Sequence, residues 1–151
     1  MNNIYNSKFE IGIRFLILFY VWEKELNADT IIGVDFICIY AKDFGIVEYN
    51  INGDNNYKYS EFANLRNQGI DSLKQLALEG LVQPFYTSDG FTYKITEQGT
   101  SYVKKLESTY SQNYLAIAKK VITYLESNSI KDVTNLVLKN ASTYGRSGDT
   151  K

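Results

Sequence analysis

The stretch LALEGLVQPFYTSDGFTYKITEQG, residues 76–99, carries the clearest structural signals in the chain. An apolar helical pattern stops at Gly80, and glycine suits the left-handed residue that closes a helix. Two short apolar and aromatic runs then flank Ser88-Asp89-Gly90, in which Asp-Gly is a favoured hairpin dipeptide. Thr96 has the side chain of a helix cap. The stretch therefore predicts a helix, a β-hairpin and a second helix.

The segment 8–26 predicts a first helix that is apolar on two faces. A helix of this kind must be covered on both sides. In a chain of 151 residues, the second face meets either the C-terminal helices or another protein, and the sequence leaves both open. Its residues are Ile11, Phe15, Leu18 and Trp22.

The segment 30–42 predicts a second helix, although its β-branched residues also suit a strand. It holds one charged residue inside an apolar run, Asp35. A buried carboxylate needs hydrogen bonds. Asp35 is therefore expected to cap a backbone group, to reach solvent, or to contact a partner.

A third helix is expected from a cap at Ser60 to Glu79, with a break near 67–69 that would leave 68–79 as a separate recognition helix. A short strand is expected at 46–49. The segment 96–127 predicts helix with a break around 108–111.

Ser129 and Asp132 resemble a capping box for a short last helix. Small and polar residues predict a mobile tail over 141–151. The expected organisation is one domain over 1–140, with a core at about 8–107 and helices at about 109–140.

The order helix, helix, helix, hairpin, helix is that of a winged helix. The phrase LKQLALEGLV and the pair Thr96 and Gly99 also resemble that superfamily. The expected fold class is mainly α (α+β): a winged helix with a β-hairpin wing and additional C-terminal helices. Fold alone does not assign a function, because one fold hosts many.

Composition excludes several kinds of chemistry. The chain has no histidine and a single cysteine, Cys38. Histidine-based catalytic triads and cysteine-rich metal sites are therefore ruled out. No phosphate-binding loop is present, so we expect no enzyme activity, no cofactor, no metal and no small-molecule substrate. Without disulfides or a signal-peptide pattern, the expected location is the cytoplasm.

The charge pattern argues against DNA as the main partner. The formal net charge is -1, whereas freestanding nucleic-acid binders are usually basic. Between residues 58 and 99 the only basic residues, and the candidate DNA contacts, are Lys58, Arg66, Lys74 and Lys94, against five acidic residues. Asp89 lies at the hairpin tip, where it would repel phosphate. Any DNA contact is therefore expected to be indirect or made within a complex.

Aromatic residues indicate a protein interface instead. The chain has 13 tyrosines and 8 phenylalanines, and tyrosine is enriched where proteins meet. The hairpin alone carries Phe85, Tyr86, Phe91 and Tyr93. We expect these residues, with the second face of the first helix, to contact partners.

A closer resemblance spans about residues 8–126. It is carried by EIGIRFLILFY, by VDFICIY with its central aspartate, by LALEGLV and the hairpin, and by YSQNYLAIAKKVITYL. In these elements the chain resembles the middle component of bacterial three-component ABC-ATPase systems, the group that includes Lamassu antiphage defence. The family pattern often carries arginines and prolines between the second and third helices, whereas this chain has only Arg66 there.

The resemblance implies a cytoplasmic, non-catalytic accessory or scaffold subunit. Its implied partners are an SMC-like ABC ATPase and an effector subunit, often a nuclease, in an antiphage or anti-plasmid complex. No membrane contact is implied. The alternative is a winged-helix transcriptional regulator that binds duplex DNA as a homodimer.

Overall fold

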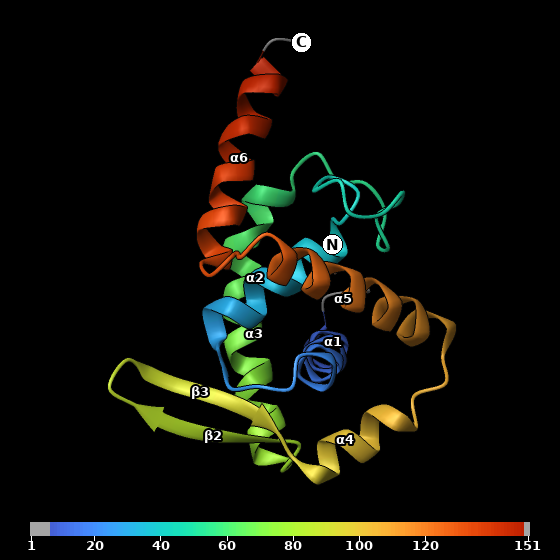
Figure 1. Ribbon diagram of the computed structural model, residues 1–151, viewed down its shortest axis with the longest axis vertical. Coiled ribbons are helices and arrows are strands. Elements are labelled where there is room, and N and C mark those ends of the chain that lie inside the picture. Colours follow the sequence, from blue (N-terminus) through green and yellow to red (C-terminus); the bar gives the residue numbers. More distant parts are fainter. Residues whose placement is uncertain (1–6, 150–151) are drawn as a thin grey trace.

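The computed structural model describes the backbone of residues 7–149 and the side chains of residues 7–142. These residues form six α-helices and one three-stranded antiparallel sheet (Figure 1). In chain order the elements are α1 (Lys8–Val21), β1 (Leu26–Asn27), α2 (Ala28–Ile39), α3 (Lys58–Leu78), β2 (Val82–Thr87), β3 (Gly90–Ile95), α4 (Glu97–Lys104), α5 (Thr109–Ser127) and α6 (Val133–Asp149). The coarse expectation of a mainly helical α+β protein is confirmed.

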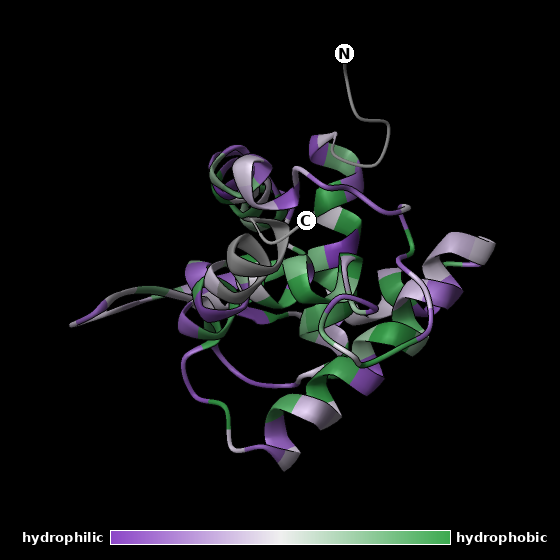
Figure 2. Ribbon diagram, turned by 90° about the horizontal axis from the view of Figure 1, so that it is seen from above, coloured by the Kyte–Doolittle hydropathy of each residue, from purple (hydrophilic) through white to green (hydrophobic). Residues whose placement is uncertain are grey.

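The centre of the molecule is built around α1 and α2. Helix α1 packs against α2, α3, α4 and α5, while α2 packs against α3, α5 and α6. Most residues of both helices are buried, and Figure 2 shows hydrophobic residues gathered at the centre of the molecule. The second face of α1 is therefore covered by the chain itself, which decides between the two possibilities that the sequence leaves open.

Helix α2 forms where the sequence allowed either helix or strand. The Asn27 side chain accepts a hydrogen bond from the Thr30 N–H at 2.8 Å, which caps the first turn. Every residue from Ile31 to Ile39 is buried. Burial on all sides outweighs the weak strand propensity of its β-branched residues. The helix ends at Ile39, three residues before the expected end.

Helix α3 is one continuous helix of 21 residues, so the expected break near 67–69 is wrong. A Cβ at Gly69 would lie 2.9 Å from Ile32 Cγ1 and 3.1 Å from Phe15 Cζ. This glycine therefore permits close packing on α1 and α2. Tyr57 is the N-cap, and the Ser60 hydroxyl donates instead to the Tyr57 carbonyl at 2.8 Å.

The sheet has the strand order β1-β3-β2. Strand β2 pairs with β3 along its whole length, from Val82 with Ile95 to Thr87 with Gly90. Proline lacks an N–H, so it suits an edge strand, and Pro84 lies on the edge strand β2. The two-residue strand β1 is a feature that the sequence did not predict. The strand expected at 46–49 does not form.

Three residues set the junction between α3, the hairpin and α4. Gly80 has φ 75°, as expected for a glycine that closes a helix. The Thr96 hydroxyl accepts from the Gly99 N–H at 3.0 Å and donates to the Gly80 carbonyl at 2.7 Å. The predicted cap is confirmed, and it also holds the two ends of the hairpin together.

The C-terminal helices form where the sequence predicts helix, but α6, with 17 residues, is longer than the short last helix that was expected. A break separates α4 from α5, and Ser108 caps α5. Asp132 caps α6 by accepting from the Asn135 N–H at 2.9 Å, whereas Ser129 lies in a left-handed turn with φ 53°. The Ser129–Asp132 capping box is therefore wrong. The backbone of α6 continues as helix to Asp149, and the expected mobile tail stays a prediction.

Candidate functional site

Most of the first-helix residues expected to meet a partner lie inside the protein. Ile11, Phe15 and Leu18 are fully buried. Their side chains fill the core that α1 shares with its neighbouring helices, so they offer no surface in this structure. Trp22 is partly buried, and the Lys24 ammonium lies 4.2 Å from its ring centroid.

The hairpin aromatics are placed differently. Tyr86, Phe91 and Phe85 are 81%, 55% and 39% exposed. The Tyr86 and Phe91 rings meet edge to face with their centroids 5.3 Å apart. Figures 1 and 2 both show the hairpin projecting away from the helical body. The fourth aromatic, Tyr93, is partly buried at its base, and burial raises the pKa of its hydroxyl.

The candidate DNA contacts do not form one patch. Lys58 is 2% exposed, and its ammonium lies 3.3 Å from an Asp43 carboxylate oxygen. Arg66 is exposed but paired with Asp29 at 3.0 Å. Lys74 and Lys94 are exposed. Lys58 therefore offers no surface to a phosphate, and the charge of Arg66 is locally balanced.

A buried polar cluster crosses the centre of the molecule. The Arg14 guanidinium donates two hydrogen bonds to Asp35, at 2.8 Å and 3.0 Å, and the Tyr114 hydroxyl donates to the same carboxylate at 2.6 Å. All three residues are fully buried. They come from α1, α2 and α5, so this cluster ties three helices together. The carboxylate is neither a backbone cap nor exposed, which corrects the main expectation for Asp35.

The cluster perturbs the ionisation of its neighbours. Burial alone would lower the pKa of Arg14, but the Asp35 carboxylate more than reverses this, so the pKa is raised. Burial, reinforced by Asp35, raises the pKa of the Tyr114 hydroxyl and of the Cys38 thiol well above their usual values. Cys38 is thus a protonated core residue, as its apolar surroundings in the sequence indicate.

The long connection between α2 and α3 is held by polar side chains. Asn50 is buried, accepts from the Lys42 N–H at 3.1 Å, and donates to Asp54 at 2.9 Å. The Tyr110 hydroxyl donates to Asn52 Oδ1 at 2.8 Å, which joins the loop to α5. The spacing of these residues in the sequence did not predict the hydrogen bonds that hold the loop.

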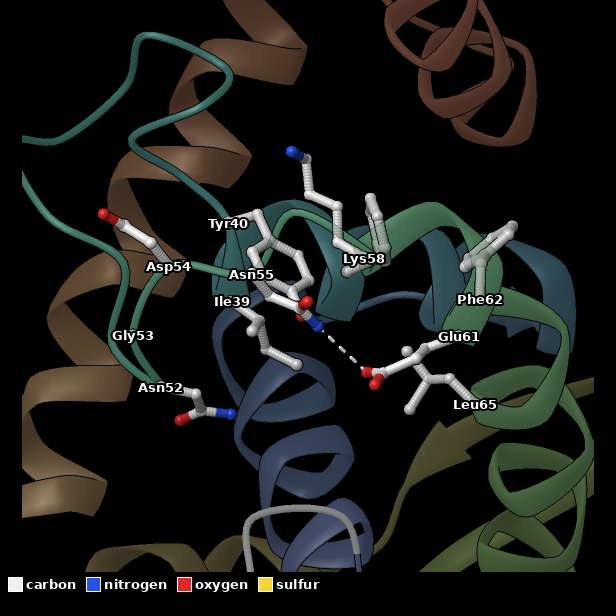
Figure 3. A pocket seen from close by; sticks show the side chains of 11 residues that line it. Ile39, Tyr40, Asn52, Gly53, Asp54, Asn55, Lys58, Glu61, Phe62 and Leu65 are labelled. Atoms are coloured by element: carbon white, nitrogen blue, oxygen red, sulfur yellow. Dashed lines mark hydrogen bonds between the residues drawn. The ribbon is translucent and has the colours of Figure 1, made fainter. Parts of the chain in front are cut away.

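A small cavity opens between this loop and the two helices (Figure 3). Its volume is about 210 Å³, below the roughly 300–1,000 Å³ of most small-molecule sites. The Asn55 amide donates to Glu61 at 3.1 Å and to the Tyr40 hydroxyl at 3.3 Å, as Figure 3 shows for Glu61. Because these polar groups already bond to one another, the arrangement favours holding the loop over binding a ligand.

Among residues 7–142 no group of three or more candidate metal-ligating side chains occurs. Within the described part of the chain, none of the helices has the length and apolar character needed to cross a bilayer. The described residues thus present an exposed aromatic hairpin and a core held by a buried ion pair.

These features define a mainly helical protein with a projecting β-hairpin. The chain belongs to the family of the ABC-three component (ABC-3C) system Middle Component 2, whose model matches residues 4–147. The resemblance to a middle component of these systems is confirmed at this level. No curated protein and no solved structure shows a significant match to the chain.

Proposed function

We propose that the chain is a non-catalytic accessory subunit of an antiphage or anti-plasmid complex of the Lamassu type in the cytoplasm. It would link an SMC-like ABC ATPase to an effector subunit. Membership of a middle-component family supports a role among protein partners. The site chemistry adds a second argument, because the buried polar groups bond to each other and hold the fold.

We assign the fold to the winged helices. The order α1, β1, α2, α3, β2, β3 and the sheet order β1-β3-β2 support this assignment. A long loop replaces the short turn that usually joins the two helices of a helix-turn-helix. The chain would thus keep the winged-helix frame with a different surface beside its third helix.

The exposed aromatic hairpin is the observation that carries the proposal. Two large rings are more than half exposed at the end of a projecting element. Aromatic residues of this kind form the anchors of protein interfaces. The turn beside them carries Asp89, which disfavours a phosphate backbone. The hairpin therefore suits a protein partner better than DNA.

The test is co-expression of the tagged chain with the ABC ATPase and the effector component of its own system. Wild type should co-purify with both components. The double variant Tyr86→Ser/Phe91→Ser should lose at least one of them, because it removes both exposed rings. Leu138→Ser, which alters an exposed apolar residue on α6, serves as the control. A wild-type chain that purifies alone would overturn the proposal.

A homodimeric winged-helix regulator of transcription is the second candidate, and the strand order also favours it. Its DNA contacts would include the exposed Lys74 and Lys94. A gel-shift series across salt concentrations separates the two candidates. A regulator should bind one duplex sequence tightly with a steep salt dependence, whereas the accessory subunit alone should not.

A further inference from the structure

An apolar groove lies between α1 and the C-terminal half of α3, beside Tyr102 of α4. Its volume is about 320 Å³. Phe9, on its wall, is 65% exposed, although it is one of the largest apolar side chains in the protein. Most of the surface in the groove comes from apolar side chains, which are Phe9, Ile13, Leu16, Leu76, Leu81 and Tyr102.

Small residues bring the two long walls of the groove together. The Ser72 hydroxyl donates to the Lys8 carbonyl at 3.2 Å. A Cβ at Gly12 would lie 3.7 Å from Leu76 Cδ2, which is an ordinary contact, with no other atom among its near neighbours. These two contacts show that α1 and α3 run in the same direction along the groove. A side chain at position 12 would enter it.

The two ends of the groove carry opposite charges. Lys8 lies at the end marked by Ser72, and Glu79 lies near the other end, beyond Leu76. Both are exposed, and the Gln75 amide donates to Glu79 at 2.9 Å. Between them the groove has no charged group that would orient a small polar ligand. The groove therefore matches an elongated ligand that has an apolar stripe, an acidic residue at one end and a basic residue at the other.

We propose that this groove binds an amphipathic helix of another component of the same ABC system. The helix inserts apolar side chains spaced three and four residues apart, as helices do in apolar grooves. Its acidic end lies at Lys8 and its basic end at Glu79. A second copy of this chain fits less well, because a groove filled by a different surface of the next copy is a heterologous contact, which builds a ring or a filament, whereas most soluble oligomers are two-fold dimers with self-complementary interfaces. The inference rests on the proposed function, since it requires a complex with those components.

Gly12→Leu is the sharpest test, because its side chain occupies the groove without removing any wall. It also replaces a helical glycine, which favours the helix by propensity. We expect its affinity for the purified partner component to fall at least about tenfold, the loss typical of blocking a central anchor. The smaller Gly12→Ala is the matched control and should bind within about twofold of wild type. Urea unfolding of both variants checks that they fold.

Charge reversal tests the direction of the helix. Lys8→Glu and Glu79→Lys should each weaken binding by about threefold or more, the scale of one exposed ion pair. Lys131→Glu, at an exposed site outside the groove, should change nothing. These affinities are measured with the purified components at low salt, where exposed charges are least screened.

The outcomes separate the two proposals. If the wild-type chain binds neither component, the proposed function itself fails. If wild type binds and a folded Gly12→Leu binds equally well, the proposed function stands and the groove inference is overturned. The inference is also overturned if Gly12→Leu converts a dimer of this chain to a monomer in sedimentation, because a second copy would then be the occupant.

Discussion

The fate of Asp35 shows what a single residue contributes here. Two hydrogen bonds from Arg14 and one from Tyr114 converge on a carboxylate with no solvent access. A buried pair of this kind gains little over apolar packing, yet removing one partner leaves a buried charge without compensation. We infer that the cluster fixes how α1, α2 and α5 meet.

Asp35→Asn should lower the free energy of unfolding by about 3–5 kcal/mol, because the buried guanidinium loses its countercharge. The double variant Arg14→Met/Asp35→Leu should recover much of that loss. The measurement is urea unfolding followed by circular dichroism. The exposed pair Arg66 and Asp29 is the comparison, and Asp29→Asn should change stability by less than about 1 kcal/mol. A loss for Asp35→Asn no larger than that for Asp29→Asn would contradict the argument.

Alkaline pH should destabilise the fold through Tyr114. Its pKa is raised in the folded state, chiefly by burial, so above the ordinary tyrosine pKa of about 10 the unfolded chain holds fewer protons than the folded one. Stability is therefore complete below that pH and falls as the pH rises further. Cys38 acts with the same sign, starting near its ordinary pKa of about 8.5.

The check is the unfolding midpoint in urea between about pH 8 and 11, the range that spans the ordinary pKa values of Cys and Tyr. Tyr114→Phe and Cys38→Ser should each flatten the decline relative to wild type. Tyr86→Phe, which changes an exposed tyrosine, should leave the slope unchanged. If the urea midpoint falls equally with pH in wild type and in all three variants, Tyr114 and Cys38 do not cause the loss of stability at alkaline pH.

At the scale of elements, the sequence correctly predicted the turns and helix ends that are determined by neighbouring residues. The turn at Asp89, the helix end at Gly80 and the cap at Thr96 all depend on a few neighbouring residues, and the structure has each of them. Gly69 lies inside the continuous helix α3, where it packs closely against Ile32 and Phe15. A sequence shows the glycine but not the distant side chains that require it.

Two glycines in helices should respond oppositely to alanine. A Cβ at Gly99 would lie 2.2 Å from the Leu81 carbonyl oxygen and 2.7 Å from Ile95 Cγ1, so Gly99→Ala must displace backbone. We expect a loss of about 1–3 kcal/mol or more, as for overpacked cores. Gly12→Ala has room and should gain up to about 1 kcal/mol from helix propensity. Thermal and urea unfolding measure both, and a stabilised Gly99→Ala would show that α4 shifts freely against the hairpin.

At the scale of the whole molecule, the sequence predicted the fold class better than the surfaces. The apolar run of α1 required burial on both faces, but only the three-dimensional arrangement shows that α3 and α5 supply the cover. Arg14 escaped notice because its partner Asp35 lies 21 positions away along the chain, and Tyr114, which donates to the same carboxylate, lies 100 positions away. The exposure of Tyr86 and Phe91 follows from local structure, because few side chains can cover the tip of a hairpin. Their role as partner contacts stays a prediction.

The balance of charge and aromatic surface predicts how binding will depend on salt. The affinity of an interface anchored by aromatic rings depends weakly on ionic strength. The affinity that comes from phosphate contacts falls steeply as the salt concentration rises. We expect the affinity for the ABC ATPase component to change by less than about tenfold between roughly 0.05 and 0.5 M salt, since screening acts mainly on exposed charges. Any binding of the isolated chain to duplex DNA, through Lys74 and Lys94, should disappear over the same range. Titrations of both ligands, with Lys74→Gln/Lys94→Gln as the control, measure the two slopes. A steep slope for the protein partner would mean that charged surface, and not the hairpin, carries that interface.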